Sequence, residues 1–179
     1  MKNPIFMPVL TIAAAAAVLF AANAGLSGIR EENTRREWDH IMSTILPGGE
    51  TFIEETYAGE DANIRAAYKS ETGYVVHTVT VGYAGDVSML VGVSSEGQVT
   101  GLVVRDLQET PGLGRKALTD TEFLAQFLNT DGNAAVGEDI DALTGATVTS
   151  KAVTRGVNSA VGFVTGADTS SSATTWGGR

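Results

Sequence analysis

The stretch between Lys2 and Arg30 contains no charged residue and consists mostly of apolar side chains. Taken as a helix, residues 4–29 would be about 39 Å long, which exceeds the hydrocarbon core of a bilayer at about 30 Å. Its alanines and larger aliphatic residues favour a helix, and the segment has no polar face. We therefore expect residues 1–29 to form a single N-terminal transmembrane helix that anchors the remaining chain.

Two alternatives for this stretch stay open on residues alone. Ala22-Asn23-Ala24 has the small residues of a signal-peptide cleavage site, although the apolar region is longer than the usual core of about 7–15 residues. For orientation, Lys2 precedes the span, and three arginines follow it closely, at positions 30, 35 and 36. Positive-inside counting therefore favours a cytoplasmic location for the rest of the chain.

Composition excludes several kinds of site. The chain has no cysteine, so it cannot form a disulfide, a thiolate nucleophile or a cysteine-ligated zinc or iron–sulfur centre. Its two histidines, His40 and His77, are too few for a multi-histidine metal or haem site. We assign neither histidine a metal-binding or catalytic role. The excess of 21 Asp and Glu over 12 Lys and Arg argues against binding to a nucleic-acid backbone.

After the anchor, the sequence predicts an α+β fold in which an antiparallel sheet is flanked by helices. Residues 30–49 are expected to form a helical stalk, because apolar residues recur at helical spacing until Pro47-Gly48-Gly49 ends the pattern. Residues 50–167 would form the folded domain. The tail, residues 168–179, is rich in Ser and Thr and is expected to be disordered.

Within this domain, five segments of alternating or β-branched character predict the strands of a meander. The strands are expected at residues 51–57, 64–70, 73–82, 87–93 and 99–106. His77 shares one face of the third strand with valines, which favours a structural histidine over a catalytic one. Residues 119–129 and 149–165 carry apolar residues at helical spacing and predict two helices. Gly156 and Gly162 weaken the second helix, so we expect close packing on the sheet to support it.

The second predicted helix is preceded by the segment Asp141-Ala-Leu-Thr-Gly-Ala-Thr-Val-Thr-Ser150. Its hydroxyl groups crowd the start of the helix, where unpaired N–H groups and the macrodipole attract anions. They belong to Thr144, Thr147, Thr149 and Ser150. Gly145 and Ala146 leave room for a ligand to approach the backbone, as in phosphate-binding loops. The segment is either a phosphate site or an ordinary helix N-cap supplied by a threonine.

A second candidate segment follows the last predicted strand. It contains the sequence Glu109-Thr110-Pro111-Gly112-Leu113-Gly114, followed by Arg115 and Lys116. Pro-Gly marks a tight turn that exposes backbone N–H groups, and the flanking residues offer a carboxylate, a hydroxyl and positive charge. The pattern is consistent with a loop that contacts a ligand and equally with an ordinary connection.

Together, residues 109–114 and 141–150 resemble the FMN-binding domain of the G subunit of the Rnf electron-transport complex. They are also similar to the C subunit of the sodium-translocating NADH:quinone oxidoreductase, and the resemblance covers nearly the whole chain. The later segment resembles the recognition sequence of a flavin transferase, which attaches FMN through a phosphoester. The resemblance implies Thr147 as the attachment residue. The other implied cofactor-site residues in this segment are Asp141, Thr144, Gly145, Ala146, Thr149 and Ser150.

The resemblance further implies that Glu109, Thr110 and the loop through Gly114 lie against the isoalloxazine ring. It implies a membrane-anchored flavoprotein that relays electrons within an ion-translocating complex, rather than an enzyme acting alone. The implied partners are other subunits of the complex, a flavin transferase during maturation and membrane lipid. The implied location is an extracytoplasmic domain on a single-pass anchor in the plasma membrane, opposite to the arginine count. A membrane-tethered module that holds a phosphorylated ligand non-covalently, with no redox role, is the alternative.

Overall fold

The computed structural model describes residues 15, 32, 35–107 and 119–167. The chain divides into two compact units, Met1–His40 and Ile41–Arg179. The predicted anchor lies outside the described residues except for Ala15, and the predicted tail lies outside them entirely. Among the residues that are described, no helix combines the length and the apolar character needed to cross a membrane.

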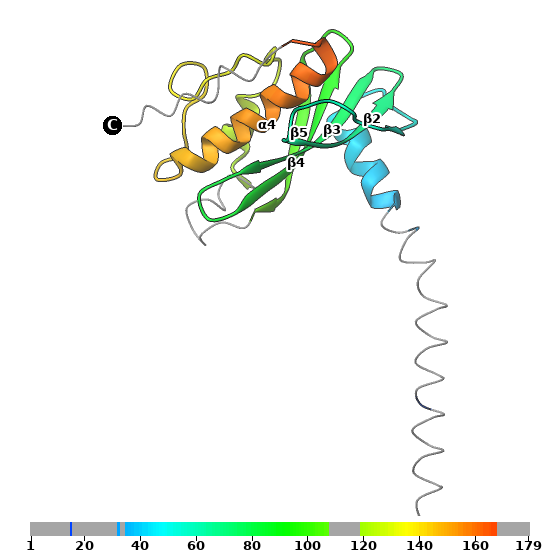
Figure 1. Ribbon diagram of the computed structural model, residues 1–179, viewed down its shortest axis with the longest axis horizontal. Helices are drawn as coiled ribbons and strands as arrows, with labels where there is room; N and C mark the ends of the chain where they lie inside the picture. The colour runs from blue at the N-terminus through cyan, green and yellow to red at the C-terminus, as the bar shows by residue number, and fades with distance from the viewer. Residues whose placement is uncertain (1–14, 16–31, 33–34, 108–118, 168–179) are drawn as a thin grey trace, which may run out of the picture. The chain divides into compact units, whose positions relative to one another are not determined.

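The second unit contains a five-stranded sheet in the order β1-β2-β3-β4-β5, with each strand antiparallel to the next (Figure 1). The strands are β1 (Ile53–Glu55), β2 (Ile64–Ser70), β3 (Gly73–Val81), β4 (Asp86–Ser94) and β5 (Val99–Leu107). This order confirms the predicted meander. Valine and other β-branched residues favour these strands because they suit a pleated, partly buried surface. The first strand is much shorter than the expected residues 51–57, and the others lie within one residue of their expected ends.

The helices α3 (Thr121–Ala125) and α4 (Thr147–Thr165) follow the sheet in the chain. The prediction of a helix over residues 119–129 was too long. Asp120 caps α3 by accepting a hydrogen bond from the Phe123 N–H at 3.0 Å, but beyond the helix the chain continues in tighter turns. Asn129 then adopts a left-handed conformation with φ 63°, which a helix cannot include.

α4 packs across one face of the sheet and runs antiparallel to β3 (Figure 1). Near the start of the helix, the Thr80 hydroxyl donates to the Ala152 carbonyl at 2.9 Å. Near its end, the rings of Tyr74 and Phe163 meet edge to face with centroids 5.4 Å apart. The start of α4 therefore lies at the end of the sheet where β3 turns into β4.

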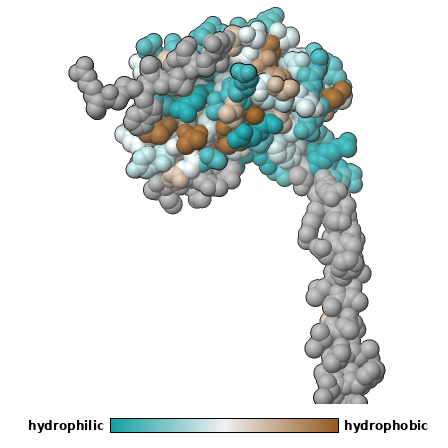
Figure 2. All heavy atoms as spheres, in the orientation of Figure 1, coloured by the Kyte–Doolittle hydropathy of each residue, from teal (hydrophilic) through white to brown (hydrophobic). Residues whose placement is uncertain are grey.

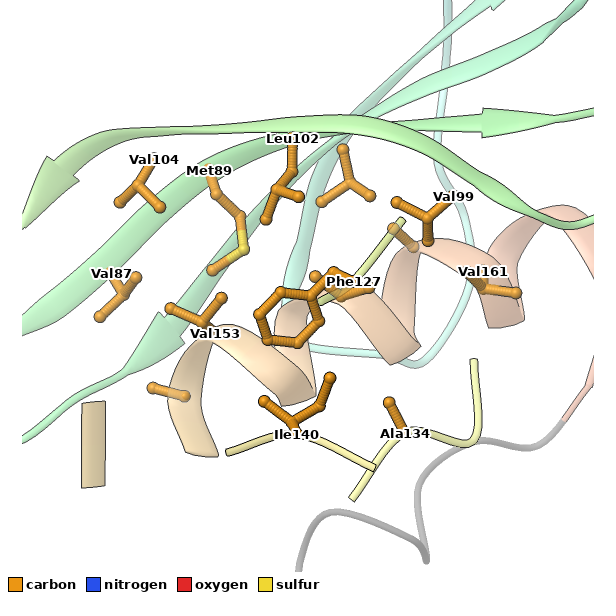
Figure 3. Packing of buried hydrophobic residues seen from close by; sticks show 14 of the residues in the cluster. Val87, Met89, Val99, Leu102, Val104, Phe127, Ala134, Ile140, Val153 and Val161 are labelled. Carbon is orange, nitrogen blue, oxygen red and sulfur yellow. The ribbon is translucent and has the colours of Figure 1, made fainter. Parts of the chain in front are cut away.

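The main core fills the space between the sheet and α4. Figure 3 shows the Phe127 ring among residues of the sheet, such as Leu102, and residues of α4, such as Val153. A Cβ on Gly156 would lie 2.9 Å from the Thr78 hydroxyl oxygen and 3.0 Å from the Met89 methyl carbon. The helix and the sheet approach so closely there that only glycine fits without displacement, as expected from the sequence.

Directional hydrogen bonds cross this same interface, and we refer to them as the polar seam. The seam includes the bond between Thr80 and the Ala152 carbonyl. The Asn63 side-chain amide contacts the Ser159 hydroxyl at 3.1 Å. The buried Asn158 amide donates to the carbonyl of residue 134 at 2.9 Å. The seam thus joins α4 to β3 and to the segments before β2 and after α3.

The opposite face of the sheet is partly covered by Ile45, which lies against Gly92 and Gly101, and the neighbouring Met42 and Leu46 are buried as well. The Thr100 hydroxyl donates to the Ile45 carbonyl at 2.6 Å. His77 points to this face, because strand residues alternate and Thr78 faces α4. Elsewhere, apolar residues at the surface are scattered: Figure 2 shows small, separate hydrophobic patches among hydrophilic residues on the face in view.

Candidate functional site

The segment before α4 makes a tight turn that leads directly into the helix. Residues 143–146 form a β-turn closed by a hydrogen bond of 2.9 Å from the Ala146 N–H to the Leu143 carbonyl. Gly145, the third residue of the turn, has φ 77°, whereas Thr144 is not among the residues with positive φ. This is the pattern of a type II turn, which requires glycine or asparagine at the third position.

Buried and exposed residues alternate regularly along this segment, with a period of three. The buried positions are Ile140, Leu143 and Ala146, and each is followed by an exposed residue, Asp141, Thr144 and Thr147; Gly145 is exposed as well. The apolar residues anchor the segment in the core beside α4. The carboxylate and two hydroxyl groups of the predicted motif therefore face solvent from a firmly held backbone.

Not every predicted site residue is at the surface. Ser150 is fully buried, and its hydroxyl both accepts from the Leu143 N–H and donates to the Ala146 carbonyl, each at 3.0 Å. Thr149 is buried as well, with 1% of its surface exposed. Of the hydroxyl-bearing residues in the first turn of α4, Thr147 alone is exposed. Ser150 has a structural role, in which it joins the turn to the helix.

No threonine caps α4, so the ordinary N-cap interpretation was wrong. The N-cap is Ala146, which makes no side-chain capping hydrogen bond, and the first turn contains no acidic residue. The first N–H groups of a helix have no intrahelical acceptor, and the macrodipole adds partial positive charge there. Thr147 is exposed at the first helical position, at a helix start that the Ala146 side chain does not cap, and such a position suits an anion such as a phosphate.

Gln126, which follows α3, was not identified from the sequence as part of the site. Its side-chain oxygen accepts a hydrogen bond from the Asp141 N–H at 2.7 Å. Its amide nitrogen donates to the Asp141 carbonyl in a longer bond of 3.4 Å. A glutamine after a short helix has no recognisable pattern, so only the tertiary structure reveals this contact.

The other predicted loop, Glu109, Thr110, Pro111, Gly112, Leu113 and Gly114, lies outside the described residues. Its starting point is defined, however. Leu107 at the end of β5 pairs with Val87 at the start of β4. Residue 107 is therefore at the end of the sheet where α4 begins.

Comparison with known proteins identifies this region. Residues 82–162 match the model of the FMN-binding domain family. The chain is 32% identical, over 89% of its length and 93% of the relative's, to the G subunit of the ion-translocating oxidoreductase complex of Methanosarcina acetivorans. The chain belongs to this G-subunit family.

Two further members of the G-subunit family match over shorter regions. One comes from the Na(+)-translocating ferredoxin:NAD(+) oxidoreductase complex of Acetobacterium woodii and is 37% identical over 60% of this chain and 53% of that protein. The other comes from the proton-translocating ferredoxin:NAD(+) oxidoreductase complex of Clostridium ljungdahlii and is 38% identical over 63% of this chain and 60% of that protein. The chain thus spans little more than half the length of these two relatives. The family resemblance inferred from the two loop segments is confirmed.

Proposed function

We propose that this chain is the FMN-carrying subunit of an ion-translocating ferredoxin:NAD oxidoreductase complex, with the flavin joined to Thr147 by a phosphoester. The observation that carries this proposal is the exposed Thr147 hydroxyl at the uncapped start of α4, within a matched FMN-binding domain. The relatives named above support the kind of complex. Electrons would pass between neighbouring subunits through the flavin.

Attachment requires an activated phosphate, because joining free FMN to a hydroxyl would demand the loss of water. We therefore propose a flavin dinucleotide as the donor and a separate flavin transferase as the catalyst. The Thr147 oxygen forms a bond to the phosphorus that bears the flavin, the pyrophosphate bond breaks, and the nucleoside monophosphate leaves. The hydroxyl proton passes to a base of the transferase or to solvent. No electrons are exchanged in this step.

Once attached, the phosphate would lie at the start of α4, where the uncapped N–H groups and the macrodipole stabilise its charge. FMN supplies one- and two-electron chemistry when bound, while the protein supplies tethering and orientation. Glu109, Thr110 and the loop through Gly114 are proposed to contact the flavin ring. The remaining partners proposed for the chain are other subunits of the complex and membrane lipid around residues 1–29.

The decisive experiment is denaturing electrophoresis of the full chain, made together with a flavin transferase and viewed under ultraviolet light. Only a covalent flavin survives denaturation, so the wild-type band should fluoresce. Thr147→Ala removes the acceptor oxygen from an exposed position and should give a folded, non-fluorescent protein. Thr147→Ser retains an acceptor, and Thr149→Ala changes only a buried neighbour, so both should fluoresce.

Two outcomes would contradict the proposal. A fluorescent Thr147→Ala band would place the linkage on another residue. A wild-type protein that released all its flavin on denaturation would instead favour the non-covalent binding module.

A further inference from the structure

We propose that Gln126 is a positioning residue for flavin attachment, which fixes the backbone of Asp141 so that the transferase meets its carboxylate in one orientation. The inference rests on the proposed attachment to Thr147 and extends it to a residue outside the motif. Gln126 precedes Asp141 by fifteen positions in the sequence and contacts it only through the fold.

The contact engages both polar groups of the Asp141 main chain. The Gln126 side-chain oxygen accepts from the N–H at 2.7 Å, and its amide nitrogen donates to the carbonyl at 3.4 Å. A primary amide is the side chain that offers an acceptor and a donor in this arrangement. The two bonds act at two points on one residue, so they restrict rotation of the backbone on both sides of the Asp141 Cα.

Gln126 is itself held in place by the core. It is the C-cap of α3, between Phe123 and Phe127, whose buried rings pack edge to face with centroids 5.3 Å apart. The Gln126 N–H also bonds to the Phe123 carbonyl at 3.3 Å. Gln126 is half-buried as a residue, and its side chain therefore extends from a rigid support.

The Asp141 side chain is exposed, so packing against the core does not hold it in one orientation. Ile140, directly before it, is 1% exposed and anchors one side of the peptide, but a buried neighbour alone does not fix the direction of an exposed carboxylate. An exposed recognition group binds more tightly when its backbone is ordered before the encounter, since less conformational entropy is lost on binding. Gln126 provides this preorganisation.

The test uses purified full-length protein without flavin, a purified flavin transferase and flavin adenine dinucleotide. The rate of covalent loading is measured while the protein concentration is varied. Gln126→Met preserves side-chain length and removes both hydrogen bonds. The KM for the protein should rise about tenfold with kcat nearly unchanged, because the Asp141 backbone must then be ordered when the transferase binds.

Matched variants separate this role from general destabilisation. Gln126→Asn retains the amide but withdraws it by one methylene, so it should resemble Gln126→Met. Gln98→Met makes the same chemical change at an exposed turn residue between β4 and β5 and should load like the wild type. Thermal unfolding of each variant gives its folded fraction under assay conditions.

A double-mutant cycle provides the sharpest readout. If Gln126 acts through Asp141, then Gln126→Met should have little further effect in an Asp141→Ala background, because coupled residues are non-additive. Additive losses, or wild-type loading by Gln126→Met, would overturn the inference while Thr147→Ala still abolished attachment. Failure of the proposed function is distinguished by covalent flavin that persists in Thr147→Ala.

Discussion

The hydroxyl oxygen of Ser150 accepts a hydrogen bond from the backbone N–H of Leu143 at 3.0 Å, across the turn that leads into α4. The same hydroxyl donates to the Ala146 carbonyl at 3.0 Å. One buried side chain thus closes the turn against the first turn of the helix and determines where Thr147 lies.

Ser150→Ala should therefore lower the free energy of unfolding by about 1–3 kcal/mol, because it leaves a buried N–H group without its acceptor. Urea denaturation of the flavin-free protein measures this change. Thr144→Ala, at an exposed position in the same turn, should alter stability by less than about 0.5 kcal/mol. Equal, small effects of the two substitutions would show that the Ser150 bonds do not stabilise the turn.

Asp141→Ala should reduce flavin loading in cells far more than it reduces thermal stability. The Asp141 carboxylate is exposed, and the hydrogen bonds to Gln126 involve only its main chain, which alanine retains. Fluorescence per mole of protein, compared with the midpoint of thermal unfolding, checks both halves of this expectation. Near-normal loading would argue against a role for the carboxylate in recognition.

His77 should make stability depend on pH. Burial, together with the charges of Arg105 and Arg65, lowers the pKa of His77 from its usual 6.5, and its Nε2 lies 2.9 Å from the Ser88 hydroxyl oxygen. The histidine therefore binds a proton more weakly in the folded chain than in the unfolded chain. The free energy of unfolding that this histidine contributes above pH 6.5 is lost as the pH falls below that value. His77→Gln, which cannot titrate, should lose less stability than the wild type between about pH 7 and about pH 5.5 in urea denaturation. Identical losses in the two proteins would contradict this.

The location of the domain is the point on which the arginine count and the family resemblance disagree. We expect protease added to intact spheroplasts to digest the domain while cytoplasmic proteins remain protected. A reporter that is active only outside the cytoplasm, fused after Arg179, should also be active. Protection of the domain together with an inactive reporter would favour the cytoplasmic location indicated by positive-inside counting.

The strands were predictable because their signal is local. Residues 64–70 were predicted at their observed bounds, and β3, β4 and β5 lie within one residue of the expected ends. Alternation of side chains along a strand is visible in sequence whatever the tertiary context. A local signal also sufficed at Gly156, where a glycine within a helical pattern correctly predicted close packing of the helix on the sheet.

The parts of the site that could not be predicted depend on contacts between distant segments. Four hydroxyl-bearing residues near the start of α4 were equivalent in sequence, yet the fold buries Thr149 and Ser150 and exposes Thr144 and Thr147. The N-cap was ambiguous for the same reason, since any threonine there could cap a helix. Gln126 gave no local signal at all, because its partner lies beyond an intervening loop.

The polar seam has a consequence for electron transfer. The close approach at Gly156 already limits sliding of α4 along the sheet. The bonds from Thr80, Asn63 and Asn158 add to this, because they are directional and break when the helix shifts. They therefore fix the axial position of α4 and, with it, the first residue of the helix. The rate of electron tunnelling falls steeply with distance, so a redox group tethered at that residue would always be attached at the same point. Its distance to a redox partner would then vary only through motion of the tether and not through motion of α4.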